Sequence, residues 1–112
     1  MKFKINYKLD NWNDTIKHCR GNKYGANTNK KKEMQIVKYY LPKEKIEKYP
    51  VELICKWHIK NNNSDLDNKS LKSVLDAMQE AEILENDNIK HINKITYEAI
   101  KDSEDYLEVE IK

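Results

Sequence analysis

The sequence predicts a small α/β (α+β) domain with a mixed β-sheet of about four strands and two main helices, in the order β-α-β-α-β-β. Its 112 residues suffice for one domain, residues 1–112, because typical domains hold about 100 to 200 residues. In some segments apolar residues alternate with polar ones, as in half-buried strands, and in others they recur at helical spacing. No segment has the composition of an interdomain linker, and none is repeated.

Four segments have the patterns of strands. The first has apolar side chains at every second position, which are Phe3, Ile5, Tyr7 and Leu9. The second runs from Val51 to Lys60, and three asparagines, residues 61–63, end it with residues that favour turns. The segment from Ile89 to Tyr97 has a mixed strand pattern, and residues 107–111 alternate apolar residues with glutamates. These four segments are the expected strands of the sheet.

One amphipathic helix is predicted from Lys69 to about Leu84. Its apolar residues fall at positions i, i+3, i+4 and i+7, which are Leu71, Val74, Leu75 and Met78. Asn68 precedes the helix and is expected to cap its first turn.

A second helix is predicted from Lys30 to Leu41, where apolar residues recur at helical spacing and Pro42 ends the pattern. Residues 10–29 precede it and contain both glycines, five asparagines and little apolar periodicity. A connection of this length is typically functional or disordered. Its basic and aromatic character predicts a flexible basic loop that binds nucleic acid, with plain disorder as the alternative.

The net charge of +2 hides an asymmetry along the chain. Residues 1–50 hold 13 basic and 5 acidic residues, a net charge of +8, and residues 51–112 hold 8 basic and 14 acidic residues, a net charge of −6. This pattern fits a metal-dependent enzyme that acts on nucleic acid, and two ordinary solvated surfaces are the alternative. The basic residues expected to bind DNA are Arg20, Lys23, Lys30, Lys31, Lys32 and Lys94.

Targeting and metal-binding signals are sparse. The chain has no apolar run typical of a signal peptide or a membrane span, so we expect a cytoplasmic protein without a membrane partner. Its lysines, asparagines and isoleucines suit an AT-rich bacterial, phage or prophage genome. Two cysteines, Cys19 and Cys55, are expected to be reduced thiols. No zinc site is expected, because Cys55 and His58 should point to opposite faces of one strand.

The carboxylates around the helix predicted at 69–84 could bind a metal ion. Asp65 and Asp67 lie two positions apart before this helix, and in extended geometry both side chains point to one side. Such a pair suits Mg²⁺, which prefers carboxylate oxygens. A short turn after the helix is expected to return Asp87 beside them, and Lys72 supplies a cation for the phosphate.

These aspartates have two other interpretations. An EF-hand loop that starts at Asp65 is excluded, because its sixth position would be Ser70 instead of glycine and its twelfth Asp76 instead of glutamate. A helix cap at Asp67 or Asn68, with the other carboxylates as surface charges, fits the residues as well as a metal site does. The residues alone therefore leave two interpretations open, a metal site and a helix cap.

The same segment resembles a known family. Asp65-Leu66-Asp67-Asn68, followed by Lys72, Leu75-Asp76-Ala77-Met78, Ala81 and Asp87, is similar to the D-x-D-N…K…L-D-A-L…D-D signature of the RusA-type Holliday junction resolvases, which are crossover junction endodeoxyribonucleases. The similarity covers about residues 64–94, and Asn86 stands where the family has the first aspartate of its final pair.

The resemblance implies a homodimer that resolves four-way DNA junctions by paired symmetric nicks during recombination or repair. It implies Mg²⁺ as the cofactor, with Mn²⁺ as a substitute. Asp65, Asp67 and Asp87 are then the metal ligands, and with Lys72 they form the catalytic set. The competing functions are a non-catalytic DNA-binding protein that uses the basic half of the chain, and a protein-interaction module.

Overall fold

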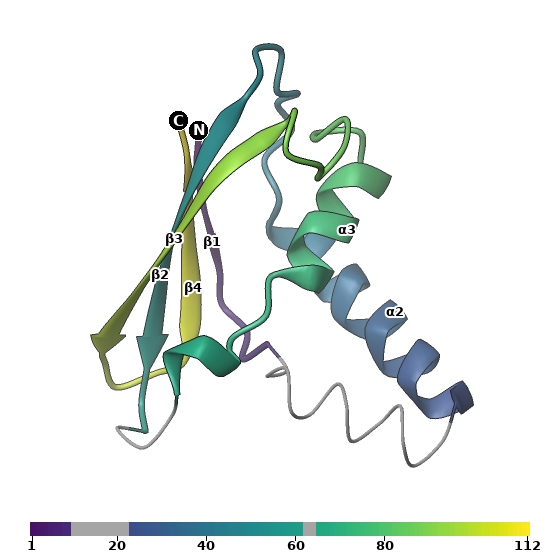
Figure 1. Ribbon diagram of the computed structural model, residues 1–112. Coiled ribbons are helices and arrows are strands. Elements are labelled where there is room, and N and C mark those ends of the chain that lie inside the picture. Colours follow the sequence, from purple (N-terminus) through teal and green to yellow (C-terminus); the bar gives the residue numbers. More distant parts are fainter. Residues whose placement is uncertain (10–22, 62–64) are drawn as a thin grey trace.

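The described part of the chain forms one four-stranded sheet with two α-helices on one of its faces (Figure 1). The computed structural model describes residues 1–9, 23–61 and 65–112, with the backbone alone over 23–30. Its elements, in chain order, are β1 (Lys2–Ile5), α2 (Lys23–Tyr40), β2 (Val51–Ile59), the 3₁₀ helix η1 (Leu66–Asn68), α3 (Lys72–Glu80), β3 (Ile92–Lys101) and β4 (Tyr106–Ile111). The predicted α+β class and the predicted order of strands and main helices are confirmed.

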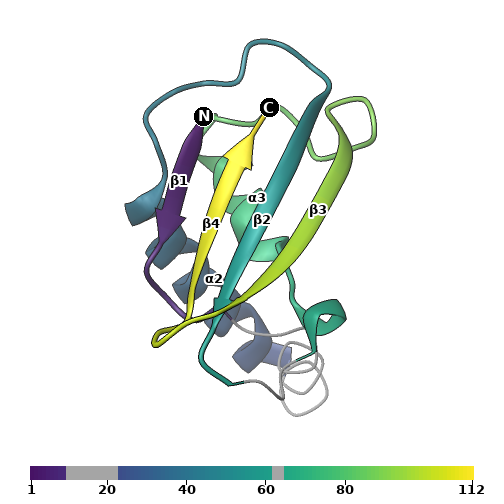
Figure 2. The same ribbon diagram turned by 90° about the vertical axis from the view of Figure 1, so that its left-hand side faces the viewer.

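The sheet is mixed, with the strand order β1-β4-β2-β3 (Figure 2). β4 pairs antiparallel with β1 and with β2, whereas β2 and β3 run parallel. Parallel neighbours need a crossover, and α3 lies in the connection between these two strands. The register pairs Val51 with Ile92 at one end and Ile59 with Lys101 at the other. The residues that follow β2 and those that precede β3 therefore lie at opposite ends of the sheet.

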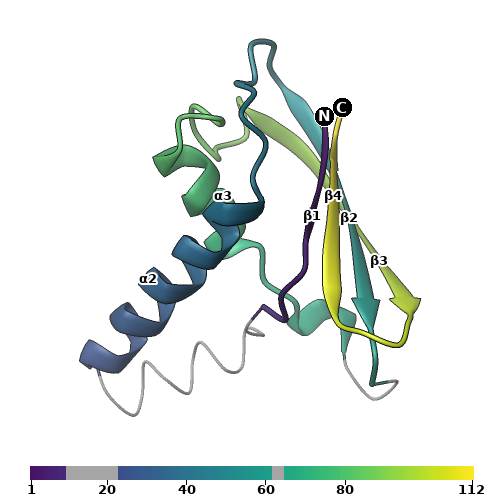
Figure 3. The same ribbon diagram turned by 180° about the vertical axis from the view of Figure 1, so that it is seen from behind.

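The core lies between the sheet and the two helices (Figure 3). Alternate residues of β2 and β4 are buried on the helix-covered face, and they include Leu53, Cys55, Trp57, Leu107 and Val109. The helices also contact each other through polar groups, because the Ser73 hydroxyl donates a hydrogen bond to the Glu33 carboxylate in the buried interface. Each of these buried polar groups satisfies the other, which removes most of the cost of desolvating them.

Helix α2 is longer than the sequence predicts. It begins at Lys23 instead of Lys30, so residues 23–29 are helical and do not belong to a loop. These residues have little apolar periodicity, and Gly25, Asn27, Thr28 and Asn29 are weak helix formers, so no sequence signal predicts these turns. Adding residues to a formed helix avoids the cost of nucleation. The remainder of the predicted basic loop, residues 10–22, lies outside the described residues.

Helix α3 is shorter than predicted at both ends. It begins at Lys72 with Leu71 as its N-cap, because Asn68 belongs to η1 and does not cap α3. It ends at Glu80, where a Schellman turn reverses the chain through hydrogen bonds from the Ile83 amide to the Met78 carbonyl at 2.9 Å and from the Glu82 amide to the Gln79 carbonyl at 3.1 Å.

Two predicted strand boundaries also differ from the structure. β1 ends at Ile5 instead of continuing to Leu9. β3 begins at Ile92 instead of Ile89, because the amides of His91 and Ile92 bond the Asn88 carbonyl in a turn, and it continues to Lys101.

The Schellman turn yields a stability prediction, because Glu82 has a φ of 61° at the position where helices favour glycine. We expect Glu82→Gly to raise the free energy of unfolding by about 0.5–1 kcal/mol, measured by urea denaturation. Glu85→Gly in the same loop is the matched control and should lower it by about 0.4–1 kcal/mol, because its backbone is not left-handed. Equal changes in both variants would contradict the assignment of strain to Glu82.

Candidate functional site

Asp65 and Asp67 lie in the turn that follows β2, and both side chains are exposed. Asp65 has an extended backbone, with φ −89° and ψ 128°, but Asp67 lies within η1. The Asp65 carbonyl accepts the Asn68 amide at 3.2 Å, which closes the 3₁₀ turn. The expectation that both aspartates share one extended segment is therefore wrong, since the chain turns between them. Their carboxylates still lie within a single turn.

Contacts with the sheet and core hold this turn in place. Leu66 packs against the hydrophobic core, and η1 contacts β3. Lys69 places its ammonium 5.9 Å from the centre of the Trp57 ring. Trp57 in turn meets Tyr97 edge-to-face, with ring centroids 5.6 Å apart. The backbone that presents Asp65 and Asp67 is thus attached to the last part of β2 and to β3.

Asp87 lies in the loop between α3 and β3, which its asparagine neighbours organise. The Asn86 side-chain oxygen accepts the amides of Asp87 at 2.7 Å and of Asn88 at 3.2 Å. The Tyr49 hydroxyl accepts the Glu85 amide at 2.9 Å and attaches the loop to the segment before β2. Asn86, which replaces an aspartate of the family pattern, therefore shapes the backbone next to the exposed Asp87.

The fold separates Asp87 from the other two aspartates. Asp65 and Asp67 follow the end of β2, whereas Asp87 precedes the start of the parallel strand β3 (Figure 1). The nine residues of β2 span roughly 25 Å at about 3.3 Å per residue. Among the described residues, no three His, Cys, Asp or Glu side chains are grouped so that they could hold a metal ion. The expectation that Asp87 returns beside the first pair is therefore wrong within one chain, because α3 carries the chain back along the sheet.

Lys72 follows Asp67 by five residues and begins α3. Its side chain is 60% exposed. Its ammonium lies 3.7 Å from an Asp76 carboxylate oxygen. Exposed pairs of this kind contribute at most about 1 kcal/mol, so the ammonium can turn to an approaching phosphate at little cost.

The predicted DNA-binding residues do not share one surface. Arg20 lies outside the described residues, and Lys23 and Lys30 are placed in α2 by their backbone. Lys31 and Lys32 are exposed on α2. Lys94 lies on the opposite side, on the open face of the sheet, with its ammonium 3.6 Å from a Glu52 carboxylate oxygen.

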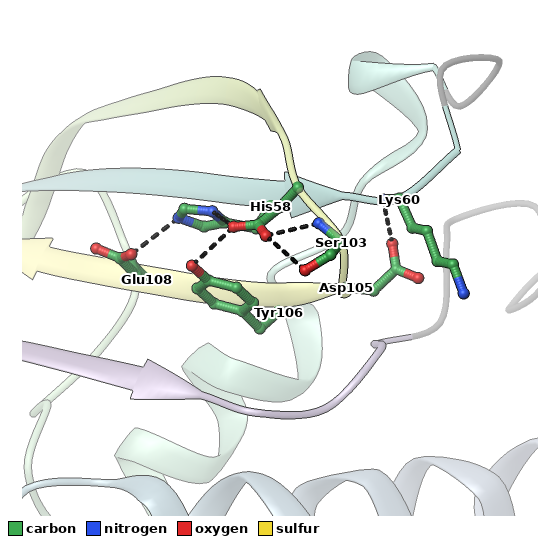
Figure 4. Close-up of polar contacts among 7 residues, drawn as sticks. His58, Lys60, Ser103, Asp105, Tyr106 and Glu108 are labelled. Carbon is green, nitrogen blue, oxygen red and sulfur yellow. Dashed lines mark hydrogen bonds and ion pairs between the residues drawn. The ribbon is translucent and has the colours of Figure 1, made fainter.

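A polar network that no sequence motif indicates surrounds His58 (Figure 4). The His58 side chain is only 9% exposed. Its Nδ1 lies 3.0 Å from Asp102 Oδ2, and its Nε2 lies 2.8 Å from Glu108 Oε1. The second contact lacks hydrogen-bond geometry, so any attraction there is ionic. The Tyr106 ring stacks on His58, with centroids 3.9 Å apart, and its hydroxyl donates to Asp102 Oδ2 at 3.1 Å.

This network stabilises the ionised form of Asp102. The Ser103 amide, then His58 and Tyr106, donate hydrogen bonds that lower the pKa of Asp102 to about 2. Burial and the nearby Asp102 carboxylate raise the pKa of Tyr106. The network ties the β3–β4 turn to the end of β2, from which the chain continues toward Asp65. His58 lies on the open face of the sheet, whereas Cys55 is buried in the core on the other face.

Neither the models of protein families nor the curated proteins give a significant match to the chain. A search of the described residues finds no helix long and apolar enough to cross a membrane.

The Asp102 network yields a prediction about acid stability. The folded-state pKa of about 2 is below the ordinary value of 3.8, so the carboxylate stabilises the fold above about pH 4, and this contribution is lost as the pH falls from about 4 to about 2. We expect Asp102→Asn to be less stable than the parent at pH 7 and to lose less stability over that window, measured by urea denaturation at several pH values. Glu104→Gln in the same turn is the control and should follow the parent. A parallel loss of stability in Asp102→Asn and the parent would contradict this role.

Proposed function

We propose that the protein is a homodimeric, Mg²⁺-dependent endodeoxyribonuclease that resolves four-way DNA junctions by paired symmetric nicks in recombination or repair. One observation carries the proposal. The motif that resembles the RusA-type signature falls on the β2–α3–β3 unit, and Asp65, Asp67, Lys72 and Asp87 are all exposed at its two ends. Exposed carboxylates and a lysine suit a site that must receive a phosphodiester from outside the fold.

The metal site needs more than one chain. Carboxylate oxygens are the ligands that Mg²⁺ prefers, and Asp65 and Asp67 supply two within one turn. In a single chain the three aspartates do not fit one ion, because Asp87 lies at the other end of the sheet. A two-fold dimer in which Asp87 of each chain lies beside Asp65 and Asp67 of the partner subunit would complete two equivalent sites. Two sites are what paired nicking of a symmetric junction requires.

The residues of the chain itself have distinct parts in such a site. A bound Mg²⁺ would supply positive charge against the phosphate. Lys72, the first residue of α3, would contact a phosphate oxygen and stabilise the charge that develops on it. Asn86 holds the backbone on which Asp87 is presented. These parts come from opposite ends of the sheet, so they meet only between chains.

Cleavage of a synthetic four-way junction tests the proposal. We expect symmetric nicks with Mg²⁺ or Mn²⁺ and none with EDTA. Asp67→Asn should still bind the junction but cut it at least about 100-fold more slowly, because a ligand of the metal is lost. Glu44→Gln, an exposed carboxylate between α2 and β2, should cut like the parent.

Three results would contradict the proposal. Equal cutting by Asp67→Asn would exclude the proposed metal site. Salt-sensitive binding without nicking in either metal would favour a non-catalytic DNA-binding protein instead. No binding at all would favour a protein-interaction module.

Mixed dimers test whether the site is shared. Asp67→Asn and Asp87→Asn chains, each inactive alone, would be unfolded and refolded together so that their subunits exchange. Each mixed dimer then holds one intact site, and we expect nicking of one strand at about a quarter of the parental level. A mixture of Asp65→Asn and Asp67→Asn is the control and should stay inactive, because both altered residues belong to the same half-site. Recovery in both mixtures, or in neither, would contradict a shared site.

A further inference from the structure

We infer that the outer edge of β3 is the surface on which a second copy of this chain pairs, antiparallel, about a two-fold axis at Thr96. The inference rests on the proposed function, because the shared metal site requires a second copy as the partner. It adds the surface, the direction and the register of the pairing.

β3 offers a long open edge. It is the last strand of the sheet and has ten residues, whereas β1 at the other edge has four. Within residues 1–9, 23–61 and 65–112, no strand pairs with the outer side of β3. Ile95 in its centre is 45% exposed. Such an edge presents backbone N–H and C=O groups to any strand that can align with it, and proteins normally shorten or cover it.

The direction of pairing follows from the position of the aspartates. Asp87 precedes the start of β3, whereas Asp67 lies in η1, which follows the end of β2 and contacts β3 (Figure 1). Antiparallel pairing about a two-fold axis places the start of one strand beside the end of the other. It therefore carries Asp87 of each copy to the end of the sheet where Asp65 and Asp67 of the partner subunit lie. Parallel pairing would leave them apart.

The charges on the open face point to the same edge. One row across β1, β4, β2 and β3 alternates in sign and consists of Lys4, Glu108, Lys56 and Glu98. Two rows away on the same face, beyond the pair of Ile54 and Thr96, Glu52 on β2 pairs with Lys94 on β3. At the β3 edge, one row therefore ends in the negative charge of Glu98 and the other in the positive charge of Lys94. These two residues are four positions apart on the same face.

These two charges fix the register. With Thr96 on the axis, Lys94 of each copy faces Glu98 of the partner subunit, so both rows continue with alternating sign. On the other face, Ile95 then lies opposite Tyr97 of the partner subunit, an aromatic and β-branched pair of the kind that stabilises sheets. Any other symmetric register moves Lys94 away from Glu98. The strand is therefore complementary to itself in this one alignment.

A cysteine on the axis tests the register directly. Thr96 would face its own copy with Cα atoms about 4.5–5.5 Å apart, within the range of about 4.4–6.8 Å for a disulfide. In a Cys19→Ser background, with Cys55 buried, we expect Thr96→Cys to form a disulfide-linked dimer on mild oxidation, resolved by non-reducing electrophoresis. Glu98→Cys is the matched control and should not cross-link, because its symmetry mate lies four positions away. Cross-linking of Thr96→Cys no greater than that of Glu98→Cys would overturn the inference.

A charge exchange tests the same pairing without a new bond. Lys94→Glu and Glu98→Lys each bring like charges together twice across the axis, and we expect each to raise the dimer dissociation constant about tenfold in sedimentation experiments. The double variant restores both pairs and should dimerise like the parent. Within one chain, the double variant places a carboxylate beside Glu52 and an ammonium beside Lys56. If Lys94 and Glu98 acted only within their own chain, the double variant would therefore form the weakest dimer of all. That outcome, or a parent that stays monomeric, would overturn the inference.

These readouts need neither DNA nor metal, so the two proposals fail separately. Dimers that cross-link at Thr96 but never nick a junction would leave the interface standing and contradict the nuclease. Junction nicking restored in the Asp67→Asn and Asp87→Asn mixture, without cross-linking at Thr96, would support the nuclease and overturn this interface.

Discussion

The parallel pairing of β2 with β3 determines where every predicted catalytic residue lies. Asp65 and Asp87 are only 22 positions apart, and a helix between them suggests a compact local site. A parallel crossover, however, must return the chain along the whole length of the sheet before the next strand begins. The residues after β2 and those before β3 are thereby held at opposite ends, and carboxylates that are close in sequence can meet only between two chains.

The fold was predictable where burial imposes a period on the sequence. The alternation from Val51 to Ile59 marks β2 because one face of that strand is packed beneath the helices. The apolar spacing around Val74 likewise marks α3. The ends of the helices were not predictable in this way. The last turn of α3 is set by backbone hydrogen bonds around Glu82, which lacks the glycine that usually marks such a turn, and the first turns of α2 have no apolar stripe.

The sequence proposes a set of residues for the candidate site, but it does not predict how the fold arranges them. The spacing of Asp65, Asp67 and Asp87 carries the motif, but strand direction depends on which strands become neighbours, and no local pattern records that choice. The network of His58 was invisible for a related reason. Its partner Asp102 lies 44 positions away, and neither residue belongs to a recognisable motif. Only the pairing of β2 with β4 and the turn before β4 bring these side chains together.

If a site is divided between two chains, each chain must hold its own carboxylates in fixed positions. An error in position at either end of the sheet would displace the carboxylates relative to one another. A rigid backbone around each aspartate preserves the positions of the carboxylates, so that no further ordering of the chain is needed when two chains associate. Each end of this sheet has its own means of support. At the end of β2, Trp57 and the His58 network anchor the chain on either side of the sheet before it enters η1. At the start of β3, Asn86 and Tyr49 hold the loop of Asp87. In the proposed dimer these residues outside the motif would act as positioning residues, and the parallel sheet between them would set the distance that a second chain must bridge.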